Sequence, residues 1–339
     1  MPQSLTARLP AVGAEELVEA FVPPPHFAGE RFDSYVPDRG QPSQQAALLA
    51  LRAFAERIGR PANGRRSLFR RAAPPEHRAG VYLDGGFGVG KTHLLASLWH
   101  AAPGPKRFGT FVEYTNLVGM LGFRAAVDAL STARLVCIDE FELDDPGDTV
   151  LMSTLLGELV AAGVHLAATS NTLPDRLGEG RFAADDFLRE IQGLSAHFDV
   201  LRIDGEDYRH RGLPTAPDPL TNAQVRAAVE AQPGSGLDDF DSLLAHLAVV
   251  HPSRYGGLVD GLSVLGLTEV RTLDDQASAL RLVVLVDRLY DRDVPVVASG
   301  VRLDQVFAPE LLRGGYRKKY FRAVSRLVAL ARDAGSVLG

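Results

Sequence analysis

The sequence predicts an α/β protein with a parallel β-sheet that helices cover on both faces. Between Gly80 and about Arg211, short apolar runs rich in β-branched residues alternate with segments of helical periodicity. This alternation is typical of parallel sheets that are buried on both sides. A glycine-rich loop of the type that binds phosphate lies between the first strand and the first helix of this region. The expected strands span residues 81–84, 108–114, 134–138, 164–169 and 198–203.

The glycine-rich loop fits the pattern in which Gly and four residues precede Gly-Lys-Ser/Thr. Glycines let successive backbone amides turn towards an anion, and the helix that follows adds the positive end of its dipole. Lys91 is expected to reach the β- and γ-phosphates of a nucleoside triphosphate, and Thr92 to place its hydroxyl on Mg²⁺. A glycine-rich turn with an incidental lysine would not explain the flanking strand and helix. The residues expected to bind nucleotide are Gly85, Gly86, Phe87, Gly88, Val89, Gly90, Lys91, Thr92 and His93.

A second motif follows one strand later, where four apolar residues, Leu135 to Ile138, end in Asp139 and Glu140. A buried strand with acids at its carboxyl end is the expected second half of a P-loop ATPase. Asp139 would hold Mg²⁺ directly or through water. Glu140 would be the general base that activates the attacking water. The alternative is a strand that ends in surface acids.

The next expected strand ends at Asn171. In open α/β sheets, ligands bind at the carboxyl edge of the strands, between motifs such as these two. Asn171 would there contact the γ-phosphate or orient the attacking water. Asn is also a good helix cap, and the residues alone leave both interpretations open.

Composition places the chain among ordinary globular proteins. It has 339 residues, 46% of them hydrophobic and 23% charged, and a formal net charge of −6 that argues against a broadly basic nucleic-acid surface. The single cysteine, Cys137, fits a reducing cytosol. No apolar run approaches the ~18 residues that a membrane span needs, and the N-terminus does not resemble a signal peptide. We therefore expect a cytoplasmic protein without membrane insertion.

Three regions are expected along the chain. Residues 1–42 are interpreted as an N-terminal arm, 43–212 as the nucleotide-binding core, and 213–339 as a mostly helical C-terminal domain with one additional strand near 294–298. The proline-rich segment 213–219 breaks all periodicity and is the best boundary.

Several motifs resemble the ZapE family of cell-division ATPases, which are bacterial AAA+-class proteins with mitochondrial relatives involved in protein quality control. The resemblance covers most of residues 35–330 and departs from the family at 108–114 and between 213 and 275. The matching segments are Leu135 to Phe141, Thr169-Ser170-Asn171, Phe198 to Tyr208, Leu285 to Asp293 and Phe321 to Leu327.

The resemblance implies an AAA+-type core with a five-stranded sheet in the order 5-1-4-3-2, Mg-ATP as substrate and Asn171 as the sensor. It also implies an arginine finger that reaches the ATP of a neighbouring subunit. Arg181 keeps the family's Arg-Phe pair and Arg189 follows its Phe-Leu pair, and each could instead be an ordinary helix-surface residue. Arg281 and Arg326 are looser candidates for sensing nucleotide from the lid side.

The leading functional hypothesis is a ring-forming homo-oligomer that hydrolyses ATP to ADP and phosphate and remodels partner proteins. The resemblance implies the division machinery and its tubulin-like polymer as partner, and leaves open whether the ring needs ATP. One alternative is a DNA-associated ATPase such as a helicase loader. The arginine-rich segment 65–71 supports it, whereas the net charge does not. Another is a nucleotide-gated binding module with little turnover, which the intact acids at 139–140 disfavour.

Overall fold

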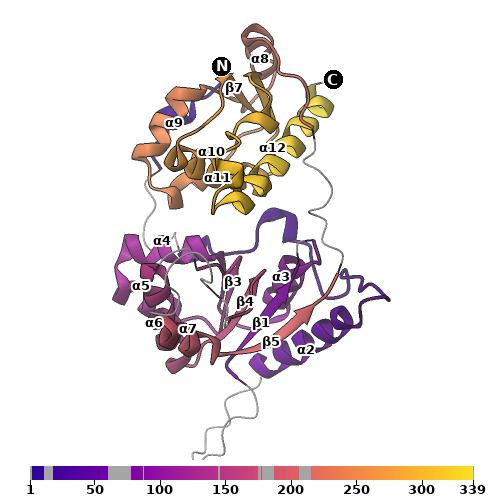
Figure 1. Ribbon diagram of the computed structural model, residues 1–339, viewed down its shortest axis with the longest axis vertical. Coiled ribbons are helices and arrows are strands. Elements are labelled where there is room, and N and C mark those ends of the chain that lie inside the picture. Colours follow the sequence, from indigo (N-terminus) through magenta and orange to yellow (C-terminus); the bar gives the residue numbers. More distant parts are fainter. Residues whose placement is uncertain are drawn as a thin grey trace, which may run out of the picture. The chain divides into compact units, whose positions relative to one another are not determined.

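The computed structural model describes residues 2–10, 18–59, 78–86, 88–143, 146–174, 177, 187–205 and 215–338. The chain divides into two compact units (Figure 1). We call Gly13–His210 the central unit, and Met1–Val12 together with Arg211–Gly339 the terminal unit. The expected N-terminal arm, residues 1–42, is therefore divided between the two units.

The central unit contains a five-stranded sheet in which every pair of neighbouring strands is parallel. The strand order β2-β3-β4-β1-β5 confirms the order expected from the sequence. Strands β1 and β3 are buried along their whole length, which fits the apolar runs Val81 to Leu83 and Leu135 to Ile138 within them. The strands are β1 (Gly80–Gly85), β2 (Lys106–Thr110), β3 (Leu135–Asp139), β4 (His165–Ser170) and β5 (Phe198–Ile203).

Helices cover both faces of this sheet, as the alternating pattern predicts. Helices α2 and α3 lie on one face and α4 to α7 on the other (Figure 1). Buried side chains of α2 and α3, such as Leu51 and Leu95, form one core with the apolar residues of β1 and β3. The helices are α2 (Pro42–Gly59), α3 (Lys91–Ala101), α4 (Phe111–Leu121), α5 (Phe123–Leu130), α6 (Pro146–Ala161) and α7 (Leu188–Ser195), with the 3-10 turn η2 (Pro25–Phe27).

Strand β2 ends four residues before the expected end of its strand, because a helix begins there. The Thr110 side chain accepts a hydrogen bond from the Glu113 amide, and the Glu113 carboxylate accepts one from the Thr110 amide at 2.7 Å. This reciprocal capping box satisfies two amides at the start of a helix. The β-favouring residues after Thr110 therefore form the first turn of α4 instead of a longer strand.

The terminal unit is mostly helical, as expected, and contains a three-stranded parallel sheet in the order β6-β7-β8. Strand β8 (Val296–Gly300) corresponds to the expected additional strand, whereas β6 (Gly236–Asp239) and β7 (Leu265–Val270) were not predicted. The start of the chain joins this unit, because the Leu5 amide donates to Asp238 at 2.9 Å and the Leu5 side chain is buried. The remaining elements are α8 (Asn222–Glu230), α9 (Phe240–Val249), α10 (Tyr255–Val259), α11 (Gln276–Asp291) and α12 (Arg317–Leu338), with the 3-10 turns η1 (Leu5–Ala7), η6 (Pro252–Arg254), η7 (Leu303–Gln305) and η8 (Leu311–Arg313).

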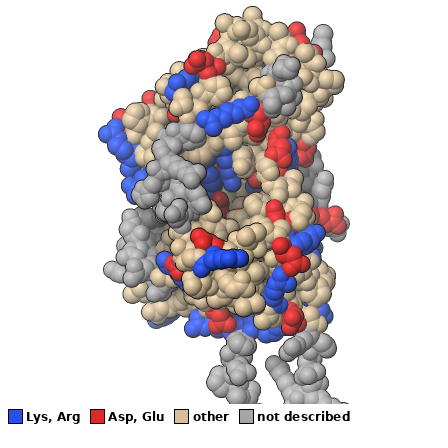
Figure 2. Space-filling view, turned by 90° about the vertical axis from the view of Figure 1, so that its right-hand side faces the viewer, with Lys and Arg blue, Asp and Glu red and all other residues tan. Residues whose placement is uncertain are grey.

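Acidic and basic side chains are interspersed on the face shown in Figure 2. Within the described residues, no helix combines the length and the apolar character that crossing a membrane requires. The arginine-rich segment 65–71 lies outside the described residues.

Candidate nucleotide-binding site

The loop between β1 and α3 has a backbone that strongly favours glycine at two positions. Gly88 and Gly90 have φ angles of +78° and +85°. A Cβ on Gly90 would also come within 2.6 Å of the Tyr35 ring. The glycines of the motif therefore allow both a left-handed turn and a close approach of neighbouring side chains. Phe87 lies outside the described residues.

Other parts of the central unit hold this loop from behind. The Tyr35 hydroxyl donates to the Val89 carbonyl at 3.0 Å, and burial raises the pKa of Tyr35, so the hydroxyl keeps its proton. The backbone at Gly205 packs so closely on Val89 that a Cβ there would lie 2.6 Å from a Val89 methyl group. These contacts hold the loop in shape, which is what preorganised binding of an anion requires.

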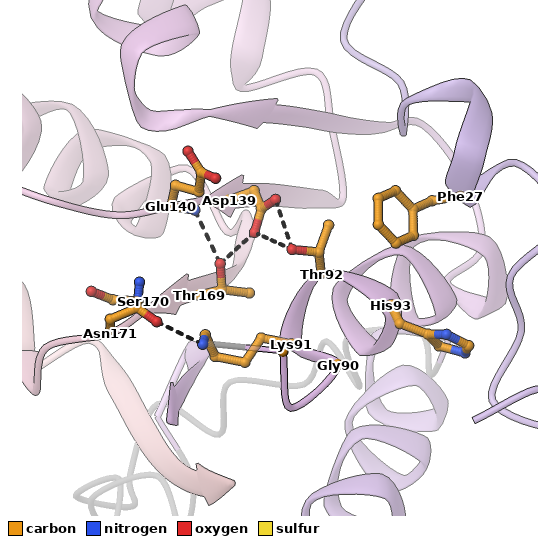
Figure 3. A pocket seen from close by; sticks show the side chains of 11 residues that line it. Phe27, Gly90, Lys91, Thr92, His93, Asp139, Glu140, Thr169, Ser170 and Asn171 are labelled. Carbon is orange, nitrogen blue, oxygen red and sulfur yellow. Dashed lines mark hydrogen bonds between the residues drawn. The ribbon is translucent and has the colours of Figure 1, made fainter. Parts of the chain in front are cut away.

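A cavity of about 270 Å³ lies at the carboxyl edge of the sheet, above this loop. Because parallel strands present their carboxyl ends at one edge, the sequence predicted that residues following β1, β3 and β4 would meet there. The structure brings Lys91, Thr92, Asp139, Glu140 and Asn171 together around the cavity (Figure 3). Its other lining residues are Phe27, Gly88, Gly90, His93, Thr169 and Ser170.

Lys91 links the loop to the end of β4. Its ammonium group donates to Asn171 Oδ1 at 2.8 Å (Figure 3). It also donates to the carbonyls of Gly85 and Gly86 at 2.8 and 2.5 Å. A positive charge is thus held where the loop, the acids and the sensor candidate converge. An ammonium in this position suits a phosphate oxygen as partner.

Asp139 is a buried carboxylate at the end of β3, only 7% exposed. It accepts hydrogen bonds from the Thr92 hydroxyl at 3.1 and 3.2 Å, and from the Thr169 hydroxyl. Burial, reinforced by the charge of Glu140, raises the pKa of Asp139 from 3.8 to about 6. The ionised carboxylate is therefore costly in this environment unless a cation offsets its charge.

The residues beside Asp139 fit a Mg²⁺ ion that arrives with phosphates. Among the described residues, no group of three or more His, Cys, Asp or Glu side chains could hold a metal by itself. Mg²⁺ usually binds through one or two protein oxygens, with water and substrate phosphates completing its shell. The Asp139 carboxylate and the Thr92 hydroxyl, in mutual contact, are oxygen ligands of this kind.

Glu140 has a φ angle of +54°, the left-handed region that non-glycine residues rarely adopt. Its amide donates to the Thr169 hydroxyl at 3.0 Å, and the Phe141 amide donates to the Thr169 carbonyl at 2.7 Å. Sequence reasoning noted Thr169 as part of a motif but gave it no role. It also missed Phe27, which lies far from the loop in the sequence and carries no motif.

The structure describes three of the four arginine candidates, and none of these three is among the residues that line the cavity. Arg181 lies outside the described residues, and Arg189 is exposed on α7 and does not line the cavity. In the terminal unit, Arg326 pairs with Asp287 and its guanidinium lies 5.0 Å from the Tyr290 ring centre. Arg281 is half-buried on α11.

Comparison with known proteins identifies a family to which the chain is similar. A family described as AFG1-like ATPase matches residues 12–232 and 216–335. Cell division protein ZapE of Escherichia coli K12 is 29% identical over 297 residues, covering 73% of this chain and 76% of ZapE. Lactation elevated protein 1 homolog B of Danio rerio is 24% identical over 173 residues, covering 43% of this chain and 33% of its own. The solved structure of AMPPCP-bound DnaA from Aquifex aeolicus covers 91% of this chain and 92% of its own, with 11% identity and a TM-score of 0.38.

Replacing Lys91 with alanine is expected to weaken ATP binding by about 100-fold or more, because charge-assisted contacts to the phosphates are lost. Titration with a fluorescent ATP analogue measures the affinity. Lys319→Ala, which removes a lysine of the terminal unit, is the matched control and should bind like the wild type. An unchanged affinity in Lys91→Ala would reject the role assigned to this lysine.

Asp139→Asn is expected to raise the melting temperature of the protein at pH 8 in EDTA without nucleotide. The folded-state pKa of Asp139 lies above its ordinary value, so its ionised form destabilises the fold at high pH. Each pKa unit corresponds to ~1.4 kcal/mol, which gives a gain of at most about 3 kcal/mol. The gain should shrink as the pH falls through 6 and disappear below about 4, where the carboxyl is protonated in both states.

Asp128→Asn is the control for this comparison, because Asp128 is exposed and pairs with Arg124 at 3.4 Å on the surface of α5. Its melting temperature should follow the wild type at every pH. A pH-independent difference between Asp139→Asn and the wild type, or a lower melting temperature at pH 8, would contradict the account of the buried charge.

Proposed function

Because the chain belongs to the AFG1-like ATPase family, we propose that it binds ATP with Mg²⁺ and hydrolyses it to ADP and phosphate. The observation that carries the proposal is the convergence of one ammonium, two adjacent acids and one amide on a single cavity. A site that only bound nucleotide would need the phosphate loop but not two adjacent carboxylates. The pair of acids therefore favours hydrolysis over binding alone.

Each side chain has a role that its chemistry supports. The loop amides and Lys91 hold the phosphates and offset their charge. Mg²⁺ held by Asp139 and Thr92 would offset the charge that develops on the β- and γ-phosphate oxygens. Glu140 accepts a proton from the attacking water, which then adds to the γ-phosphorus as the β–γ bridging bond breaks. Asn171 orients the water or the γ-phosphate from the end of β4.

We further propose that the working enzyme is a ring of identical subunits in which a neighbour supplies an arginine. An arginine offsets charge in the transition state of phosphoryl transfer, and the described residues that line the pocket include none. Arg189 is exposed on α7, where another chain can reach it, and Arg181 is the other candidate. Oligomer size measured with and without ATP would decide whether the ring assembles only with ATP.

The partner that we propose is a component of the cytoplasmic division machinery, moved or released as ATP is hydrolysed. The relative named Cell division protein ZapE, which matches over 73% of the chain, supports this choice. Within that machinery, the specific target that we propose is the tubulin-like polymer of the division ring. A DNA-associated role has weaker support, because the net charge is −6 and charges of both signs alternate on the face in Figure 2. Salt-dependent binding to single-stranded DNA would favour that role instead.

Glu140→Gln is expected to bind ATP within about threefold of the wild type and to lower kcat by about 100-fold or more, since an amide cannot act as a base. Phosphate release and ATP affinity are measured on the same preparations. Glu142→Gln removes a carboxylate of the same segment that does not line the cavity, and should hydrolyse ATP normally. Wild-type turnover in Glu140→Gln would show that another group is the base.

Mixing experiments test the shared site. Arg181→Ala, or Arg189→Ala if that is the finger, should lose turnover and regain it when mixed with Lys91→Ala chains, which keep the arginine. Arg313→Ala, which removes an exposed arginine of the terminal unit, should keep full activity alone. If both candidate variants lose activity and neither is restored by mixing, the arginines act within their own chain. If both keep activity alone, neither is a finger.

A further inference from the structure

Thr169 connects β4 to both acids that follow β3. Strands β3 and β4 are paired in parallel, with Ile138 opposite Ala168, so Thr169 lies level with the end of β3. Thr169 is 1% exposed. The hydroxyl donates to the Asp139 carboxylate and accepts from the Glu140 amide at 3.0 Å, while the Thr169 carbonyl accepts from the Phe141 amide at 2.7 Å.

These bonds hold an unfavourable backbone at Glu140. Successive residues of an extended strand point to opposite faces, so Asp139 and Glu140 would normally diverge. With φ at +54° the chain turns, and both acids line the same cavity. A left-handed residue other than glycine persists only where its surroundings compensate for the strain. Thr169 supplies two of the compensating bonds, and the buried ring of Phe141 packs 5.2 Å from that of Phe111.

The Thr169 hydroxyl acts as a hydrogen-bond donor and as an acceptor at the same time. It has one proton to donate, which goes to Asp139, and lone pairs to accept the Glu140 amide proton. Serine can make the same two bonds. Valine has nearly the same shape as threonine but would leave the carboxylate and the amide without these partners.

We propose that Thr169 is a positioning residue for ATP hydrolysis, holding the magnesium ligand Asp139 and the base Glu140 in one arrangement; this inference rests on the proposed function. Groups that orient metal ligands from behind typically change metal affinity or activity by about 10–100-fold when they are removed. The predicted loss concerns Mg²⁺ use and turnover, whereas contacts between Lys91 and the phosphates are left in place.

The test compares Thr169→Val, Thr169→Ser and Thr154→Val in the full-length protein. Thr154→Val makes the same chemical change at an exposed helical site, where the hydroxyl donates to the Val150 carbonyl of the same helix at 2.8 Å. For each protein we would measure the melting temperature, ATP affinity in EDTA, the Mg²⁺ concentration that half-saturates nucleotide binding, and kcat and KM. If Thr169→Val does not fold, Thr169→Ala takes its place.

Thr169→Val should lower kcat by about 10–100-fold and raise the half-saturating Mg²⁺ concentration, with ATP affinity in EDTA within about threefold of the wild type. Thr169→Ser should restore both quantities, and Thr154→Val should leave them unchanged. The inference is overturned if Thr169→Val keeps wild-type kcat and Mg²⁺ dependence, or if Thr169→Ser is as impaired as Thr169→Val. Should wild-type protein bind Mg-ATP without hydrolysing it, the proposed function fails and the Mg²⁺ dependence of binding still decides the role of Thr169. Wild-type protein that binds no nucleotide would overturn both.

Discussion

Parallel pairing of β1, β3 and β4 is the constraint on which the candidate site depends. Because the three strands run in one direction, the loop after β1, the acids after β3 and the amide after β4 emerge at one edge. Parallel sheets of this kind are found with helices covering both faces. Strands β1 and β3 accordingly are buried at every position. The same burial that stabilises the sheet gives the site its low-dielectric floor.

The site is locally unfavourable in two ways. The Asp139 carboxylate is desolvated, and its raised pKa records the cost. Glu140 is held in a left-handed backbone. Costs of this kind collect at functional sites, where the surrounding fold compensates for them. Here the compensation comes from hydroxyls of two neighbouring elements, Thr92 on α3 and Thr169 on β4.

The parts of the fold that local sequence determines were predictable. Continuous apolar runs identified the buried strands, and motif spacing singled out the residues from Lys91 to Asn171 that now surround one cavity. The predicted end of β2 was too late, because β-favouring residues continue past Thr110. A capping box at Thr110 begins helix α4 there instead. Strands β6 and β7 were not predicted, because neither has a continuous apolar run. Strand β6 has four residues, two of them acids, and β7 contains glycine, threonine and glutamate.

Residues whose importance is purely tertiary could not be predicted in this way. The bonds of Thr169 to residues 28 to 30 positions earlier exist only once β3 and β4 are paired. Phe27 reaches the cavity from a turn that precedes the loop by many residues and has no periodic signal of its own. The central claim, that this edge of the sheet hydrolyses ATP, is tested most directly by phosphate release from the wild-type protein with and without Mg²⁺ over a range of protein concentrations. The account predicts release that requires Mg²⁺ and rises more steeply than protein concentration as subunits assemble. Firm ATP binding with no Mg²⁺-dependent release at any concentration would contradict it.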